Sequence, residues 1–145
     1  MKKSLIALCL LTYAVGFSQE WYTELSAAKH AAATTNKKIL LVFSGPGWCA
    51  NCMRLDEILW SSPEFKAEAE KNWVLLRADF PQKKGMPEPF NVNAENVVLA
   101  EKYNRDGFFP FVVLLDKNGR KLDKQGYENL DTPGEYVALL EKMGR

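Results

Sequence analysis

The 145-residue chain has few of the features that mark membrane or nucleic-acid-binding proteins. Its apolar run near the N-terminus, Leu5–Val15, is shorter than the roughly 20 residues that a spanning helix needs, and no later run is long enough. Its 19 basic and 18 acidic residues are interspersed and leave a net charge of +1. No extended field of one sign results. We therefore predict neither a nucleic acid nor a membrane surface as a partner.

The chain also lacks internal repeats and low-complexity tracts, and it contains one histidine and three cysteines. Hydrophobic residues make up 47% and charged residues 26% of it. This composition is typical of one globular domain with a single core.

The first residues differ from the rest. A positive start, Met1-Lys2-Lys3, precedes the apolar run, and Gly16-Phe17-Ser18 supplies small residues at the positions of a cleavage site. This pattern predicts a secretory signal peptide over residues 1–18 and a mature domain over residues 19–145. An uncleaved membrane anchor is the alternative.

Cleavage would remove Cys9 and leave Cys49 and Cys52 as the cysteines of the mature chain. A disulfide between them would close a loop of two residues, which restrains an unfolded chain very little. A disulfide that serves only to stabilise the fold is therefore a poor explanation of the pair. A zinc site is another alternative, but zinc needs four ligands and the sole histidine, His30, is predicted on a different helix. We therefore expect no metal, and redox chemistry is the better interpretation.

The cysteines follow a run typical of a buried strand, Lys38–Phe43, and a turn over residues 44–47. The segment Ala50–Trp60 has the pattern of a helix, so the pair lies where a helix begins. Unpaired N–H groups and the helix dipole favour a thiolate there. We expect Cys49 to be the exposed nucleophile and Cys52, one turn along, the shielded resolving thiol.

The rest of the chain alternates between helical and strand patterns and then ends in a hairpin and a helix. This order predicts an α/β fold, with a mixed central sheet and helices on both faces. The expected elements are a helix over residues 20–34, a capped helix over 63–71, a strand over 73–80, a loop over 81–93, a helix over 94–103, strands over 112–115 and 120–125 joined by a turn at 116–119, and a helix with a capping box from Thr132.

These motifs, taken in order, resemble those of the thioredoxin superfamily. They are Trp48-Cys49-Ala50-Asn51-Cys52 after an apolar strand, Phe109-Pro110 before the next strand, and the Asn118-Gly119 hairpin with Gly126 beyond it. More narrowly, the chain is similar to exported bacterial thioredoxin-like proteins related to the C-terminal domain of the membrane thiol–disulfide interchange protein. The segments that carry this likeness are Phe43-Ser44-Gly45, Asp79-Phe80-Pro81 and Leu99-Ala100-Glu101-Lys102-Tyr103.

The resemblance implies a substrate site around the dithiol. Pro110 would be cis and face the cysteines, the backbone of Phe109 would pair with an extended substrate, and Trp48 would offer substrates a flat apolar surface. A trans Pro110 and a Trp48 buried for packing are the alternatives. Phe111, where thioredoxins usually carry threonine, would make the groove more apolar.

The chain departs from the family in one respect. Thioredoxins keep a buried carboxylate six residues before the first cysteine to accept the proton of the resolving thiol, and Phe43 occupies that position. Asp56 and Glu57 are candidate substitutes, although surface acids are the simpler interpretation, and water could relay the proton.

The sequence therefore predicts a thiol–disulfide oxidoreductase that acts on exported proteins without a cofactor. No charged residue separates the two cysteines, which favours a reductant or mild exchanger over a strong oxidase. We expect a monomer in the bacterial periplasm, with the membrane interchange protein as a candidate electron donor. The competing hypothesis is a binding module that keeps the fold without the catalysis.

Overall fold

The computed structural model describes residues 19–82 and 92–145. The expected signal peptide and most of the expected loop at residues 81–93 lie outside the described residues. Within the described ranges, none of the helices has the length and apolar character that a membrane crossing requires.

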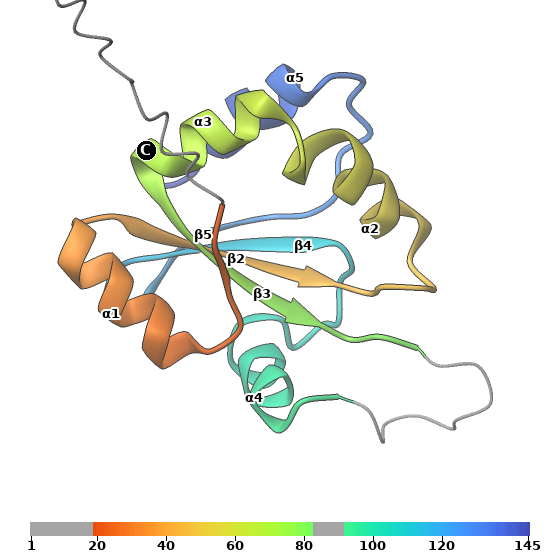
Figure 1. The fold of residues 1–145 in the computed structure, drawn as a ribbon. Helices are drawn as coiled ribbons and strands as arrows, with labels where there is room; N and C mark the ends of the chain where they lie inside the picture. The colour runs from red at the N-terminus through yellow and green to blue at the C-terminus, as the bar shows by residue number, and fades with distance from the viewer. Residues whose placement is uncertain (1–18, 83–91) are drawn as a thin grey trace, which may run out of the picture.

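The fold is built on a mixed sheet of five strands in the order β1-β3-β2-β4-β5 (Figure 1). Strands β1 and β2 run parallel to β3, whereas β4 pairs antiparallel with both β2 and β5. The predicted mixed sheet is therefore confirmed. The strands are β1 (Trp21–Tyr22), β2 (Lys38–Ser44), β3 (Trp73–Asp79), β4 (Phe111–Leu115) and β5 (Lys121–Gln125).

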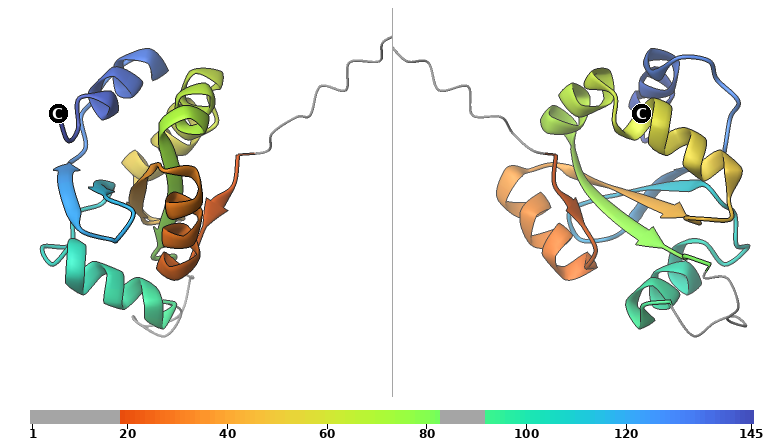
Figure 2. Two further views of the ribbon diagram at one scale, coloured as in Figure 1. Left: turned by 90° about the vertical axis from the view of Figure 1, so that its left-hand side faces the viewer. Right: turned by 45° about the vertical axis from the view of Figure 1, so that its right-hand side comes forward.

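Helices cover both faces of this sheet, as predicted (Figures 1 and 2). Helices α2, α3 and α5 lie on one face, with a π-helical turn, η1, directly after α2, and α1 and α4 lie on the other. Their bounds are α1 (Leu25–Thr35), α2 (Ala50–Leu55), η1 (Asp56–Trp60), α3 (Pro63–Asn72), α4 (Ala94–Tyr103) and α5 (Pro133–Glu141).

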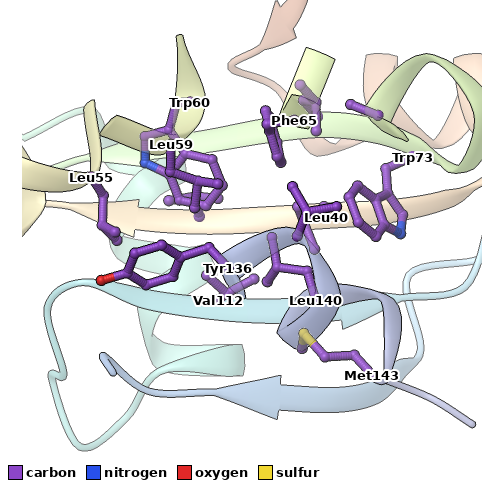
Figure 3. Close-up of a cluster of buried hydrophobic side chains, with 14 of the residues drawn as sticks. Leu40, Leu55, Leu59, Trp60, Phe65, Trp73, Val112, Tyr136, Leu140 and Met143 are labelled. Carbon is purple, nitrogen blue, oxygen red and sulfur yellow. The ribbon is translucent and has the colours of Figure 1, made fainter. Parts of the chain in front are cut away.

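Strand β2 is buried on both faces because it lies in the middle of the sheet between two helical layers. Its side chains alternate between the layers, as the two-residue period of a strand requires. Leu40 and Val42 pack in the core beneath α2, α3 and α5. Figure 3 shows Leu40 in this core. Leu41 and Phe43 pack in the second core with α1 and α4. The central strand thus divides the interior into two clusters.

The N-terminal prediction was wrong by five residues. The helix expected from Glu20 begins at Leu25, and Trp21 lies in the edge strand β1. Trp21 packs edge-on against Trp60 at 5.8 Å between ring centroids and stacks on Phe65 at 6.3 Å. Burying an aromatic ring against another layer outweighs the local helical pattern, because aromatic residues also suit a half-buried strand.

The other local predictions hold to within a residue or two. Ser62 caps α3, Thr132 and Glu135 form the capping box of α5, and Gly119 has the positive φ of 85° that its turn requires. The helix expected over residues 50–60 changes to π-helical geometry at Asp56.

Replacing Phe65 with alanine should cost about 3–5 kcal/mol of unfolding free energy. Its ring is fully buried and contacts three tryptophans, Trp21, Trp60 and Trp73. Denaturant unfolding measures the loss. Val98→Ala, at a side chain 60% exposed, is the control and should change stability by less than about 0.5 kcal/mol. An equal effect of the two substitutions would contradict this account of the core.

Candidate active site

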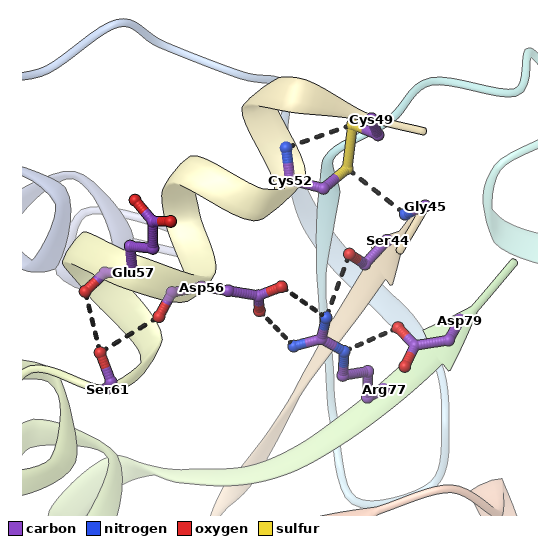
Figure 4. A network of polar contacts seen from close by, with 9 residues as sticks. All are labelled: Ser44, Gly45, Cys49, Cys52, Asp56, Glu57, Ser61, Arg77 and Asp79. Carbon is purple, nitrogen blue, oxygen red and sulfur yellow. Dashed lines mark hydrogen bonds and ion pairs between the residues drawn. A yellow bond between two sulfur atoms is a disulfide. The ribbon is translucent and has the colours of Figure 1, made fainter. Parts of the chain in front are cut away.

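The two cysteines lie directly after the central strand of the sheet. Strand β2 ends at Ser44, residues 45–48 turn, and Cys49 is the N-cap of α2. Cys49 and Cys52 form a disulfide with their Cα atoms 5.2 Å apart (Figure 4). The predicted place of the pair at a helix start is therefore confirmed.

Each sulfur accepts a hydrogen bond from a backbone N–H. The N–H of Cys52 donates to Cys49 Sγ at 3.2 Å, and the N–H of Gly45 donates to Cys52 Sγ at 3.4 Å. Donors of this kind favour a sulfur that carries negative charge. The backbone around the strand end thus places one N–H donor against each sulfur.

Of the two cysteines, Cys49 is slightly the more accessible. It is 7% exposed and Cys52 is 1% exposed. The expected order of accessibility is correct, whereas the expectation of an exposed Cys49 was too strong. Cys49 is thus nearly enclosed in the oxidised structure.

Trp48, directly before Cys49 in the chain, contacts the aromatic residues Phe80 and Phe109. Its side chain is 41% exposed, so the alternative of a buried packing residue is wrong. Its Nε1–H donates to the carbonyl of Phe80 at 2.7 Å, and its ring meets Phe109 edge-on at 5.3 Å. The close approach needs a glycine at residue 45, because a Cβ there would lie 2.4 Å from the indole.

The Phe109–Pro110 peptide bond is cis, as the resemblance implied. Because β4 pairs antiparallel with β2 and Phe111 lies opposite Phe43, residues 109 and 110 lie at the end of the sheet that carries the cysteines. A hollow of about 250 Å³ lies beside them, with six lining residues: Phe108, Phe109, Pro110, Phe111, Gly126 and Tyr127. Phe111 also packs against Phe43 in the core.

A cluster of charged side chains beside the dithiol helix was missed by the sequence reasoning (Figure 4). Arg77 on β3 binds Asp56 through both terminal nitrogens, at 2.7 and 3.2 Å. Its Nε donates to Asp79 at 2.7 Å, and Nη2 also donates to the hydroxyl of Ser44 at 3.1 Å. A lone arginine in an otherwise buried strand was the signal in the sequence that could have indicated an acidic partner.

The pKa of Arg77 lies above its ordinary value. Burial lowers this pKa, but the hydrogen bonds and charge attraction of Asp56 and Asp79 outweigh the burial. Asp56 is therefore an ion-pair partner rather than a plain surface acid, whereas Glu57 is exposed.

The residue at the position of the family's buried carboxylate, Phe43, faces away from the dithiol helix. Phe43 is fully buried in the layer of α1 and α4, opposite α2. The next residue, Ser44, contacts Arg77 on the dithiol side. The residue six positions before Cys49 is thus apolar, as the sequence indicated. The side chain that faces the charge cluster belongs to the next residue, Ser44.

Comparisons with known proteins agree with this geometry. A family model described as thioredoxin-like matches residues 20–117. The disulfide bond reductase DsbH of Chlamydia pneumoniae is 32% identical over 124 residues, which cover 86% of this chain and 70% of DsbH. The thioredoxin-related protein DsbJ of the same organism is 24% identical over 106 residues, or 73% of this chain and 30% of DsbJ.

Two solved structures extend the likeness to the fold. A DsbH oxidoreductase superposes with a TM-score of 0.71 at 26% identity, covering 97% of this chain and 92% of that one. The oxidised C-terminal domain of DsbD from Neisseria meningitidis gives 0.57 at 16% identity, with coverage of 86% and 99%, and shows the fold alone. The chain belongs to the thioredoxin-like family, with the fold and the paired cysteines of its thiol–disulfide oxidoreductases.

Proposed function

We propose that this protein is an exported protein-disulfide reductase in which Cys49 attacks and Cys52 resolves. The observation that carries the proposal is the Cys49–Cys52 disulfide at the start of α2, with the more accessible sulfur at the helix N-cap. No cofactor takes part, because the electron pair moves between sulfur atoms.

The exchange proceeds in two displacements. The Cys49 thiolate attacks one sulfur of a substrate disulfide, and the other substrate sulfur leaves as a thiolate. Cys52, as a thiolate, then attacks Cys49 Sγ and displaces the first substrate sulfur. The substrate gains two electrons, and the enzyme keeps the Cys49–Cys52 disulfide. The N–H groups that bind the two sulfurs support this sequence, since each sulfur carries negative charge in one step.

The substrate-binding surface is formed by Trp48, Phe109 and Pro110. The exposed indole and the edge-on contact of Trp48 with Phe109 support this assignment. The hollow next to Pro110 is lined by apolar residues. An extended protein segment with apolar side chains beside its cysteine suits such a surface.

Residues 1–18 act as a signal peptide in this proposal, and the mature domain works in the bacterial periplasm. A reductase outside the cytoplasm needs a dithiol donor to recharge it. The membrane thiol–disulfide interchange protein is the candidate donor. The likeness to the Chlamydia pneumoniae reductase supports the direction of electron flow.

Cys49→Ser should lower insulin reduction by dithiothreitol to the uncatalysed rate, because Cys52 is only 1% exposed and does not reach the substrate. Cys52→Ser should accumulate mixed disulfides, which non-reducing gels detect, because nothing releases the captured substrate. In the full chain, which retains residues 1–18, Cys9→Ser is the matched control and should retain full activity. Full activity in Cys49→Ser would instead support a binding module whose disulfide is idle.

The reduction potential of the Cys49–Cys52 pair should lie near the roughly −270 mV of thioredoxin and far from the roughly −120 mV of a strong oxidase. The physical reason is that no charged residue separates the two cysteines, so the reduced state gains no further stabilisation from that segment. Equilibration with glutathione or dithiothreitol buffers measures the potential. A value near that of the strong oxidase would reverse the proposed direction.

Trp48→Ala should raise the KM for insulin by about fivefold, because an apolar contact worth about 1 kcal/mol is lost. Trp48→Phe retains a flat ring and is the matched control, with a smaller change in KM. Steady-state kinetics separates this effect from kcat. Unchanged KM in both variants would remove Trp48 from the substrate surface.

A further inference from the structure

The charge cluster of Ser44, Asp56, Arg77 and Asp79 has no part in the displacements described above. It lies between three elements that surround the dithiol, since Arg77 on β3 joins Asp56 of η1 to Ser44 at the end of β2 (Figure 4). The Arg77 side chain is 17% exposed. A largely buried guanidinium that donates four hydrogen bonds to these residues fixes the relative positions of the three elements.

Both residues that Arg77 joins, Ser44 and Asp56, lie close to Cys52. Ser44 directly precedes Gly45, whose N–H donates to Cys52 Sγ. Asp56 lies one turn after Cys52, and its backbone N–H donates to the carbonyl of Cys52. Residues four apart on a helix lie about 5–6 Å apart at their Cβ atoms. A free carboxylate at Asp56 would therefore disfavour a thiolate at Cys52.

We propose that Arg77 is a positioning residue for the resolving cysteine: it neutralises Asp56 and holds the Ser44–Gly45 backbone so that Cys52 leaves readily as a thiolate. The step concerned is the recharging of the oxidised enzyme. A donor thiolate attacks Cys49 Sγ, the Cys49–Cys52 bond breaks, and its electron pair departs on Cys52 Sγ. The Gly45 N–H receives that charge, and the departure is faster when the leaving thiol has a lower pKa.

The other charged groups around the cluster do not provide this neutralisation. Asp79 is an anion bound to Arg77 itself. Arg54 on α2 donates to the carbonyl of Leu130. The carboxylate of Glu57 on η1 is exposed and points away from Arg77 (Figure 4). Among the described residues that surround the cluster, Arg77 is thus the cation paired with Asp56.

The test uses the full chain with Cys9→Ser and Cys49→Ser, so that Cys52 is its only thiol. The pKa of Cys52 is read from the ultraviolet absorbance of its thiolate against pH. Arg77→Gln should raise this pKa by about one unit, and Asp56→Asn should lower it. The double variant should return toward the reference, and Arg77→Lys should lie nearer the reference than Arg77→Gln because it keeps the charge.

A purely structural role for Arg77 predicts a different pattern, in which both single variants lose stability and shift the pKa in one direction or not at all. That pattern overturns the proposal. If Arg77→Gln does not fold, Asp56→Asn alone decides: a lowered pKa supports the proposal, and an unchanged or raised one contradicts it. These titrations need no substrate or electron donor, so their outcome is independent of the proposed reductase activity on which the inference rests.

A second measurement tests the leaving-group step directly. In chains that retain Cys49 and Cys52, Arg77→Gln should slow reduction of the disulfide by dithiothreitol about threefold, and Asp56→Asn should not slow it. Equal rates in Arg77→Gln and the reference would rule out a role for Arg77 in recharging, whatever the pKa shows.

Discussion

The chemistry of this protein depends on one short junction, where the central strand β2 ends and helix α2 begins. Two backbone N–H groups, from Gly45 and Cys52, meet the two sulfurs there. This arrangement requires the strand end and the helix start to be held in a fixed relation. The sheet fixes the strand through its neighbours on both sides, and the packing of Leu55 and Leu59 in the core fixes the helix. The reactivity of the cysteines is thus a product of the packing beneath them.

Aromatic side chains surround this junction on one side, and charged side chains surround it on the other. On the outer side, Phe109 makes edge-on contacts with both Trp48 and Phe80, and Trp48 is 41% exposed. On the inner side, Arg77 pairs with Asp56 and links β3 to the turn that follows α2. The apolar side carries the surface that we propose for a substrate chain, and the charged side carries the ion pair that we propose acts on Cys52.

The family's buried strand carboxylate is absent, and a charge cluster lies on the dithiol side of the sheet. Phe43 occupies the counted position but belongs to the opposite core layer. Ionic groups instead approach from β3 and η1 and meet beneath the helix. Such an arrangement combines residues 21 positions apart in the chain, so no local motif indicates it.

Local patterns in the sequence were enough to predict most of the elements, the mixed sheet and the place of Cys49 and Cys52 at a helix start, because hydrophobic period, capping residues and turn residues act over a few neighbouring positions. The folded structure was needed to see that Trp21 joins a strand, that Cys49 is nearly enclosed, and that Arg77 meets Asp56. These features depend on which side chains meet across the sheet, and packing between distant segments outweighs local preference where large rings and charges must be buried together.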